Sequence, residues 1–190
     1  MAERADLPLF VWGETRRATR DRRVRMRRLG VIAASGIALI GATMVTKPAP
    51  RLVWNASASA PVGLYGVTPG ARVGQGDMVI ARLAEPMRTL AASRRYLPAN
   101  VLLVKRVAAL PGATVCARGR AISIDGRRVA TRRRRDGAGR PMPWWTGCRR
   151  LAPGFVFLLM PDAAESFDGR YFGPTRVSDI VGKARLLWAR

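Results

Sequence analysis

Residues 102–112 read LLVKRVAALPG: a short apolar run, one lysine, a second apolar run and a Pro-Gly turn. Apolar runs of this length that end at turn residues are typical of buried strands. Lys105 follows the first run directly, where burial would disfavour the charged form of its amine. A desolvated lysine whose pKa falls near or below ~7 can act as a general base. The stretch therefore predicts a strand and, beside it, a candidate base.

Other short runs with the same character lie on both sides of this stretch. The alternating residues 121–124 lead into Asp125-Gly126, a dipeptide that favours a tight hairpin turn. One helix is expected over residues 85–96, before Pro98 ends it. The remaining expected strands are residues 78–83, 101–104, 155–160 and 184–188. Together these patterns predict a mainly β domain with little helix.

The composition excludes several classes of site. The chain has 190 residues, with 34 Lys and Arg against 12 Asp and Glu, a formal net charge of +22, and no histidine. Without an imidazole, Ser-His-Asp and Cys-His catalysis and most zinc sites are excluded, so no metal or other cofactor is expected. Because 48% of the residues are hydrophobic, the chain is not simply a disordered basic tail.

A membrane anchor is predicted near the N-terminus. Residues 29–46 read LGVIAASGIALIGATMVT, 18 residues without a charge, which is the minimal length of a membrane-spanning helix. Eight basic residues lie in the 20 positions before this run and two, Lys47 and Arg51, in the 20 after it. The positive-inside rule therefore places residues 1–28 in the cytoplasm and residues 47–190 across the membrane.

Two alternatives remain for the apolar run. It could be a buried helix of a soluble protein, or the core of a cleaved signal peptide whose small-residue exit is residues 58–60. We favour an uncleaved anchor, because Pro61 would follow the cut directly and 28 residues are unusually long for a basic leader segment.

The two cysteines predict a disulfide. Cys116 and Cys148 both fall in the part that we place outside the cytoplasm, where thiols oxidise readily. Their bond would clamp an Arg-rich excursion from the core at about residues 116–148. The alternative, two buried thiols of a cytosolic protein, applies only if the anchor prediction is wrong.

Residues 55–65, NASASAPVGLY, form a hydroxyl-rich loop soon after the expected membrane exit. A serine hydroxyl with a neutral lysine is the known alternative for nucleophilic catalysis when no histidine is present. Taken alone, a Ser-rich loop is more often a linker, and a lysine at a strand end more often extends its amine to water.

Three segments taken together resemble a known family. The SxSxPxGLY pattern of residues 57–65, the lysine segment of residues 102–112, and SFDGRYFGP at residues 166–174 look like the three conserved boxes of type I signal peptidases, in the same order. The shortened first box is most similar to the TraF-type peptidases of conjugative-transfer systems. The likeness covers about residues 50–188, and further similar stretches are residues 96–98, 115–116, 139–143, 147–148 and 180–184.

The resemblance implies roles for individual residues. Ser59 would be the nucleophile and Lys105 the general base, while the Ser57 hydroxyl and the Ser59 backbone N–H would form the oxyanion hole. Asp168 would join Ser59 and Lys105 as a catalytic residue, although its role could be purely structural.

Two further residues of the third box would support the site. Ser166 would hydrogen-bond to the catalytic lysine and orient it. Arg170 would pair with Asp168, and for Arg170 a structural role is favoured over chemistry. Gly169 departs from the serine often found at its position, which puts only a secondary hydrogen bond in doubt.

The implied activity is acyl transfer through a serine ester, resolved by water or by an amine of the substrate itself, which would cyclise it. The resemblance implies a signal-peptidase-like β-sheet domain on a single-pass helix in a bacterial inner membrane, with the catalytic domain in the periplasm. Its substrate would be an exported precursor, the pilin of a conjugative pilus. Membrane lipid and other conjugative-transfer components would be its partners, and no nucleic acid is required.

Three alternatives stay open at this point. The chain could be a general type I leader peptidase, or a self-cleaving repressor-type protein with the same Ser/Lys chemistry. It could also be a non-catalytic, membrane-anchored basic protein whose residues 127–135, RRVATRRRR, bind nucleic acid or anionic lipid. That last alternative explains the charge but none of the three boxes.

Overall fold

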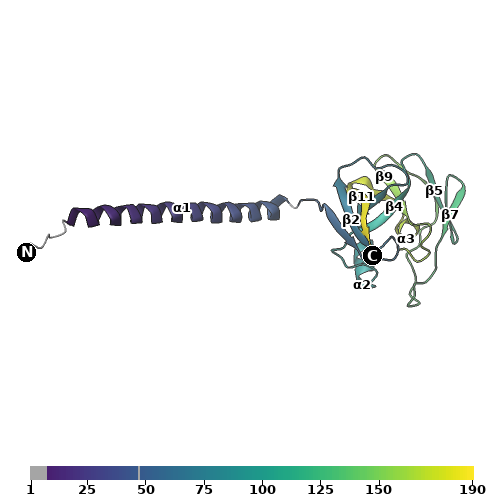
Figure 1. The fold of residues 1–190 in the computed structure, drawn as a ribbon. Coiled ribbons are helices and arrows are strands. Elements are labelled where there is room, and N and C mark those ends of the chain that lie inside the picture. The colour runs from purple at the N-terminus through teal and green to yellow at the C-terminus, as the bar shows by residue number, and fades with distance from the viewer. Residues whose placement is uncertain (1–7, 47) are drawn as a thin grey trace, which may run out of the picture. The chain divides into compact units, whose positions relative to one another are not determined.

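The computed structural model describes residues 8–46 and 48–190, in two compact units divided after Pro48. The first unit contains one long helix, α1 (Pro8–Thr46) (Figure 1). Within it, Thr19–Thr43 is long and apolar enough to cross a membrane, and none of that window is buried. Buried helices of soluble domains differ in this respect, so α1 is a candidate membrane anchor. Lys47, one of the two basic residues counted after the apolar run, and residues 1–7 lie outside the described residues.

The second unit is built almost entirely of antiparallel strands. Its strands are β1 (Leu52–Asn55), β2 (Gly63–Pro69), β3 (Met78–Ala81), β4 (Leu103–Ala109), β5 (Thr114–Arg118), β6 (Ala121–Ile124), β7 (Arg127–Thr131), β8 (Gly147–Arg150), β9 (Phe155–Leu159), β10 (Thr175–Arg176) and β11 (Ile180–Ala189). Its helices are α2 (Met87–Ser93), α3 (Gly169–Phe172) and a 3-10 turn, η1 (Val177–Asp179). The expected mainly β domain with little helix, preceded by one apolar helix, is confirmed.

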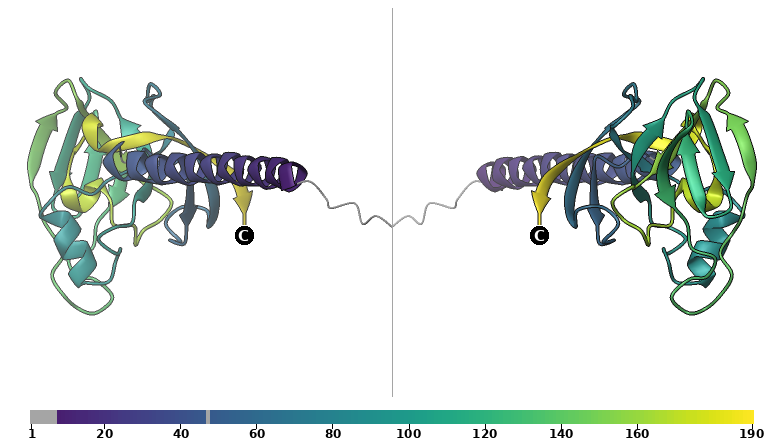
Figure 2. Two further views of the ribbon diagram at one scale, coloured as in Figure 1. Left: turned by 90° about the vertical axis from the view of Figure 1, so that its left-hand side faces the viewer. Right: turned by 90° about the vertical axis from the view of Figure 1, so that its right-hand side faces the viewer.

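The strands form two sheets. The larger has seven strands in the order β1-β2-β11-β3-β4-β9-β10, and the smaller has four in the order β7-β6-β5-β8. Figures 1 and 2 show the C-terminal strand β11 beside β2, two strands that are far apart in the sequence. Close approach of their backbones requires glycine at position 63, where a Cβ atom would lie 2.1 Å from the carbonyl oxygen of Trp188.

The core is formed by the side chains that alternate strand residues turn inward, as β4 shows. On β4 every second side chain, from Leu103 through Lys105 and Val107 to Ala109, is buried. Val107 packs with Val79, Val156 and others in one apolar cluster, and Leu103 packs with Leu83 and Ala91 in another. Lys105 lies between two apolar positions of the same face, and that places its amine in the interior.

The sequence patterns located β3, β6, β9, β11 and the helix α2 near their observed positions but misplaced the bounds of β4. The Asp125-Gly126 turn is confirmed, since Ile124 pairs with Arg127 across it and both turn residues have positive φ. The strand expected at residues 101–104 instead begins at Leu103 and continues to Ala109, so Lys105 lies inside β4 and not after it. The second apolar run therefore belongs to the same strand. Arg106 interrupts the apolar sequence, but its side chain is on the exposed face, so the strand continues through it.

The segment expected as an Arg-rich excursion contains the four-stranded sheet and the long connection between β7 and β8. Val115, Ala117 and Ile122 of this sheet pack with Phe157 and Leu159 of β9 in a buried cluster. Cys116 and Cys148 are opposite each other on β5 and β8 and form the expected disulfide.

We expect removal of this disulfide to destabilise the domain without unfolding it. The bond closes a loop across a sequence separation of 32 residues, which the chain-entropy model converts to about 3–4 kcal/mol of unfolding free energy. The double variant Cys116→Ala/Cys148→Ala should show this loss in urea unfolding of the β domain. Oxidised and reduced wild-type protein with the same unfolding midpoint would contradict the prediction.

Candidate active site

The loop between β1 and β2 carries Ser57 and Ser59, and Asn55 holds it in place. The buried Asn55 side chain accepts a hydrogen bond from the Ser57 backbone N–H at 3.1 Å. Its amide nitrogen lies 3.0–3.1 Å from the carbonyl oxygens of Ser57, Ala60 and Pro61. An amide group has only two hydrogens to donate, so these three acceptors share them. Asn55 thus fixes both ends of the serine loop.

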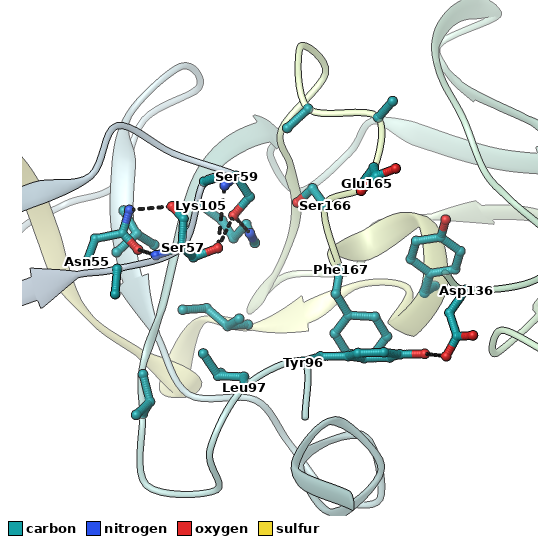
Figure 3. Close-up of a pocket in the computed structure, with 18 of the residues that line it drawn as sticks. Asn55, Ser57, Ser59, Tyr96, Leu97, Lys105, Asp136, Glu165, Ser166 and Phe167 are labelled. Carbon is teal, nitrogen blue, oxygen red and sulfur yellow. Dashed lines mark hydrogen bonds between the residues drawn. The ribbon is translucent and has the colours of Figure 1, made fainter. Parts of the chain in front are cut away.

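Ser59 faces the lysine of β4. The Lys105 Nζ atom donates a hydrogen bond to the Ser59 Oγ atom at 2.6 Å (Figure 3). The Ser57 and Ser59 Oγ atoms are 3.0 Å apart, and the Ser59 backbone N–H donates to the Ser57 hydroxyl over 3.4 Å. The structure therefore brings the expected nucleophile, base and oxyanion-hole residues together. A hydroxyl at this distance from an amine can pass its proton to it once the amine is neutral.

The surroundings of Lys105 shift its amine toward the neutral form. The side chain is only 3% exposed. Burial lowers its pKa from the usual 10.5 to about 8; the nearby Asp168 carboxylate raises the pKa, and the Arg170 guanidinium lowers it. Desolvation is the dominant cause, because an ammonium in an apolar interior loses the hydration that stabilises its charge.

Asp168 and Arg170 form a buried ion pair beside this site. Their side chains are 0% and 1% exposed, and Arg170 Nε lies 2.8 Å from Asp168 Oδ1. Asp168 also accepts hydrogen bonds from the backbone N–H groups of Met160 and Arg170. Arg170 donates to the carbonyl oxygens of Met160, Ala164 and Thr131.

These contacts join the turn after β9 to the end of β7. Asp168 reaches Lys105 only through its electric field, because all of its hydrogen bonds in the described structure go to Arg170 and Met160. In this arrangement the pair connects backbone segments that surround the candidate site.

Ser166 lies where the third box meets the cavity, but without the expected hydrogen bond. Its side chain is 2% exposed, and its Oγ atom has no hydrogen-bond partner among the described residues. The predicted bond to Lys105 is therefore absent, because the lysine amine is directed to Ser59.

Gly169 has a steric explanation. A Cβ atom there would lie 2.6 Å from the Leu158 carbonyl oxygen and 2.8 Å from the Phe157 ring. The close packing of this segment on β9 leaves no room for the serine often found at the corresponding position of the family that the sequence resembles.

A cavity of about 900 Å³ extends from the two serines and Lys105. Figure 3 shows Ser57, Ser59 and Lys105 at one end, Tyr96, Phe167 and Asp136 at the other, and Ser166 and Glu165 between them. The Leu102–Lys105 stretch, Ala163–Phe167 and Leu97–Pro98 contribute its walls. No three His, Cys, Asp or Glu side chains gather as a metal site within residues 8–46 and 48–190.

Three residues of the site were missed by the sequence analysis. Asn55 could have been found, because an Asn two residues before a serine N–H is typical of an Asx turn. Tyr96 and Asp136 line the cavity from segments 40 residues apart. Only the tertiary structure brings those two together.

Residues 23–189 match the family described as signal peptidase, peptidase S26. A conjugal transfer protein TraF of Agrobacterium fabrum is 36% identical to this chain over 177 residues, which cover 87% of this chain and 96% of that protein. A probable conjugal transfer protein TraF of Sinorhizobium fredii is 34% identical over 145 residues, covering 69% and 73%. A plasmid transfer protein TraF of Escherichia coli is 32% identical over 163 residues, covering 80% and 89%.

Similarity to solved structures is weaker. A signal peptidase I of Enterococcus faecalis aligns with 60% of this chain and 97% of its own chain, at 18% sequence identity and a TM-score of 0.35.

Proposed function

The chain belongs to the signal peptidase family, peptidase S26, and we propose that it is a membrane-anchored serine endopeptidase in which Ser59 is the nucleophile and Lys105 the general base. The observation that carries the proposal is the 2.6 Å contact between the Lys105 amine and the Ser59 hydroxyl, made by a lysine whose pKa burial lowers to about 8. At and above that pH much of the amine is neutral and free to accept a proton.

The reaction follows from these positions. Neutral Lys105 takes the hydroxyl proton of Ser59 while the Ser59 oxygen attacks the scissile carbonyl carbon. The negative charge that develops on the carbonyl oxygen is stabilised by the Ser57 hydroxyl and the Ser59 backbone N–H. Since that N–H now points at the Ser57 oxygen, the Ser57 hydroxyl must rotate to let both donors face the substrate oxygen.

Collapse of the tetrahedral intermediate completes acylation. The peptide C–N bond breaks, the leaving amine takes the proton from the Lys105 ammonium, and Ser59 holds the acyl group as an ester. Lys105 is then neutral again and can deprotonate a water molecule or an amine that attacks the ester. Once Ser59 is acylated, we expect the Ser166 hydroxyl, which lines the same cavity, to accept a hydrogen bond from Lys105 and keep it in place.

The substrate segment beside Ser59 is extended. Residues 103–105 of β4 pair with β3 on one side. On the other side β9 pairs with β4 only from Arg106 onward, so no strand of the described chain occupies that edge before it. An extended peptide can pair with such an edge and present its scissile bond to Ser59. The cavity lining between Leu102 and Lys105 supports this path.

The substrate is an exported precursor, and we take the pilin of a conjugative pilus as the specific case. The three relatives are conjugal or plasmid transfer proteins, which supports a role in conjugation. The choice of the pilin follows from the resemblance of the three boxes to TraF-type peptidases. The test is mass spectrometry of a pilin precursor co-expressed with the wild-type protein or with Ser59→Ala. Wild type should shorten the precursor at one site, whereas the variant should leave it intact.

The product mass also distinguishes the two fates of the ester. A linear product has the mass of the free segment, and a cyclic product is lighter by one water molecule. Cleavage of general secretory precursors but not of the pilin would instead indicate a general leader peptidase. Retention of DNA or anionic lipid by Ser59→Ala, with no cleavage by wild type, would favour the non-catalytic binding protein.

The orientation in the membrane is also a proposal. The excess of basic residues before the apolar run places the N-terminus in the cytoplasm and the β domain in the periplasm. A reporter that is active only in the periplasm should therefore work when fused after Arg190 and fail when fused before Met1. The inverse pattern would contradict this orientation and the processing role together.

A further inference from the structure

The connection between β7 and β8 folds into a second hairpin whose tip reaches the cavity. We define the tip hairpin as residues 132–142. Arg135 and Pro141 form a bridge across it, and the Met142 backbone N–H donates to the Arg134 carbonyl oxygen at 2.9 Å. Arg133, Arg135, Asp136, Gly137 and Met142 of this hairpin line the cavity that contains Ser59 and Lys105. The hairpin thus forms one wall of this cavity.

Asp136 organises this hairpin from within. Its Oδ1 atom accepts the backbone N–H groups of Ala138 and Arg140 at 2.9 and 2.8 Å, and its Oδ2 atom accepts from Arg140 Nε at 2.7 Å. The carboxyl side chain is only 7% exposed. Hydrogen bonds from Tyr96 and Arg140 hold its pKa well below the usual range, so the group stays ionised under all ordinary conditions.

The same carboxylate attaches the hairpin to the body of the domain. Tyr96, which follows α2, donates its hydroxyl to Asp136 Oδ2 at 2.5 Å. Two more bonds reinforce the contact: Arg94 donates to the Pro141 carbonyl oxygen at 2.7 Å, and Arg140 donates to the Arg94 carbonyl oxygen at 3.2 Å. The Tyr96 ring also packs against Phe167, a neighbour of Ser166 (Figure 3).

The base of the hairpin is fixed independently. The guanidinium of the fully buried Arg132 lies 3.5 Å from the centre of the Trp144 ring and donates to the Gly119 carbonyl oxygen. The Arg133 backbone N–H donates to the Tyr171 hydroxyl at 3.1 Å. The hairpin is therefore attached to the rest of the domain at two places: its base contacts Tyr171 of α3, and its tip contacts Tyr96.

We propose that Asp136 is a positioning residue that latches the tip hairpin to Tyr96, and that the latched hairpin is a wall selecting long precursor segments. This inference rests on the proposed function for the identity of the substrate. A peptide long enough to reach from Ser59 to Tyr96 contacts the wall, whereas a short peptide at Ser59 does not. Releasing the latch therefore weakens binding of the long peptide while the Ser59 and Lys105 geometry is unchanged.

The test uses Tyr96→Phe, because it removes only the hydroxyl that Asp136 accepts and keeps the ring that packs on Phe167. Asp136→Ala is the stronger variant. The matched control is Asp125→Ala, since Asp125 also accepts a backbone N–H, from Thr114 at 2.7 Å, but does not line the cavity. Each is assayed with a long precursor peptide and with one truncated close to the scissile bond.

For the long peptide we expect Tyr96→Phe to raise KM by about tenfold with kcat within about twofold, since binding and not the chemical step is affected. The short peptide should show no such selective rise in KM. Asp125→Ala should match the wild type with both peptides. A parallel loss of kcat with both peptides would overturn the proposal, because it would mean that Tyr96 acts on the Ser59 and Lys105 geometry.

Two further measurements separate this inference from the proposed function. Hydrogen exchange of residues 132–142 should be faster in Tyr96→Phe than in wild type whether or not any peptide is cleaved, and unchanged exchange would overturn the latch. In the Ser59→Ala background, where no cleavage is expected, Tyr96→Phe should raise the Kd of the long peptide by about tenfold. Faster exchange with an unchanged Kd would show that the hairpin is latched but selects nothing.

Discussion

Replacing Lys105 by arginine should leave a folded protein that cleaves its precursor at least about a thousandfold more slowly than wild type. Arginine keeps the positive charge of the protonated lysine on a somewhat longer side chain, but its guanidinium does not lose a proton at any working pH. The Ser59 hydroxyl, 2.6 Å from the Lys105 amine, would then have a donor in place of a base. The measurement is initial-rate cleavage of a precursor peptide by detergent-solubilised protein.

The chain supplies its own control for this substitution. Lys183 pairs with Asp77 at 2.9 Å on the surface, where its side chain is 46% exposed. Lys183→Arg keeps the charge that this ion pair needs and should cleave at the wild-type rate. Ser59→Ala gives the lower limit of the assay. Cleavage by Lys105→Arg well above that limit, at any pH where the protein is folded, would exclude Lys105 as the base.

The pH dependence of the wild-type rate is a second readout of the same prediction. Burial lowers the pKa of Lys105 to about 8, and the neutral amine is the active form. Cleavage should therefore rise with pH, reach half of its plateau near pH 8, and level off above it. A rate that falls as the pH rises through this range would mean that the protonated amine is needed.

The strands that were predicted best are those that contain a short local apolar run. Residues 155–160 and 184–188 lie in or overlap β9 and β11, and the two-residue turn of the β6–β7 hairpin follows from Asp125-Gly126 alone. The pattern failed at β4, where Arg106 interrupts an apolar run that the strand simply passes through. Which strands pair could not be predicted, because the contact between β11 and β2 closes a separation of more than 100 residues.

The candidate site shows the same limit. Ser57, Ser59 and Lys105 could be named because their boxes are short and ordered along the chain. Asn55 has a local signal in its turn. The Tyr96–Asp136 contact has no local sequence signal, because it joins the segment after α2 to a hairpin 40 residues later. That Ser166 has no hydrogen-bond partner among the described residues likewise depends on where the Lys105 side chain points, which no local pattern encodes.

The second large effect is expected at the buried ion pair. Asp168→Asn should lower the unfolding free energy of the domain by about 3–5 kcal/mol, because it leaves the Arg170 cation buried without its counter-charge. The pair is 0–1% exposed and bonded on several sides. Urea unfolding monitored by tryptophan fluorescence measures the loss. Glu165→Gln breaks the Arg133–Glu165 pair, where Glu165 is 78% exposed, and should change stability by less than the error of the measurement.

The same variant distinguishes a structural from a chemical role of Asp168. The Asp168 carboxylate raises the pKa of Lys105, so its neutralisation should lower that pKa and move the midpoint of the pH–rate curve below that of wild type. Since no hydrogen bond of Asp168 reaches Ser59 or Lys105 in the described structure, the plateau rate should fall by less than about tenfold at a temperature where the variant is folded. A plateau reduced by several orders of magnitude, with the midpoint unchanged, would instead place Asp168 in the proton-transfer chemistry itself.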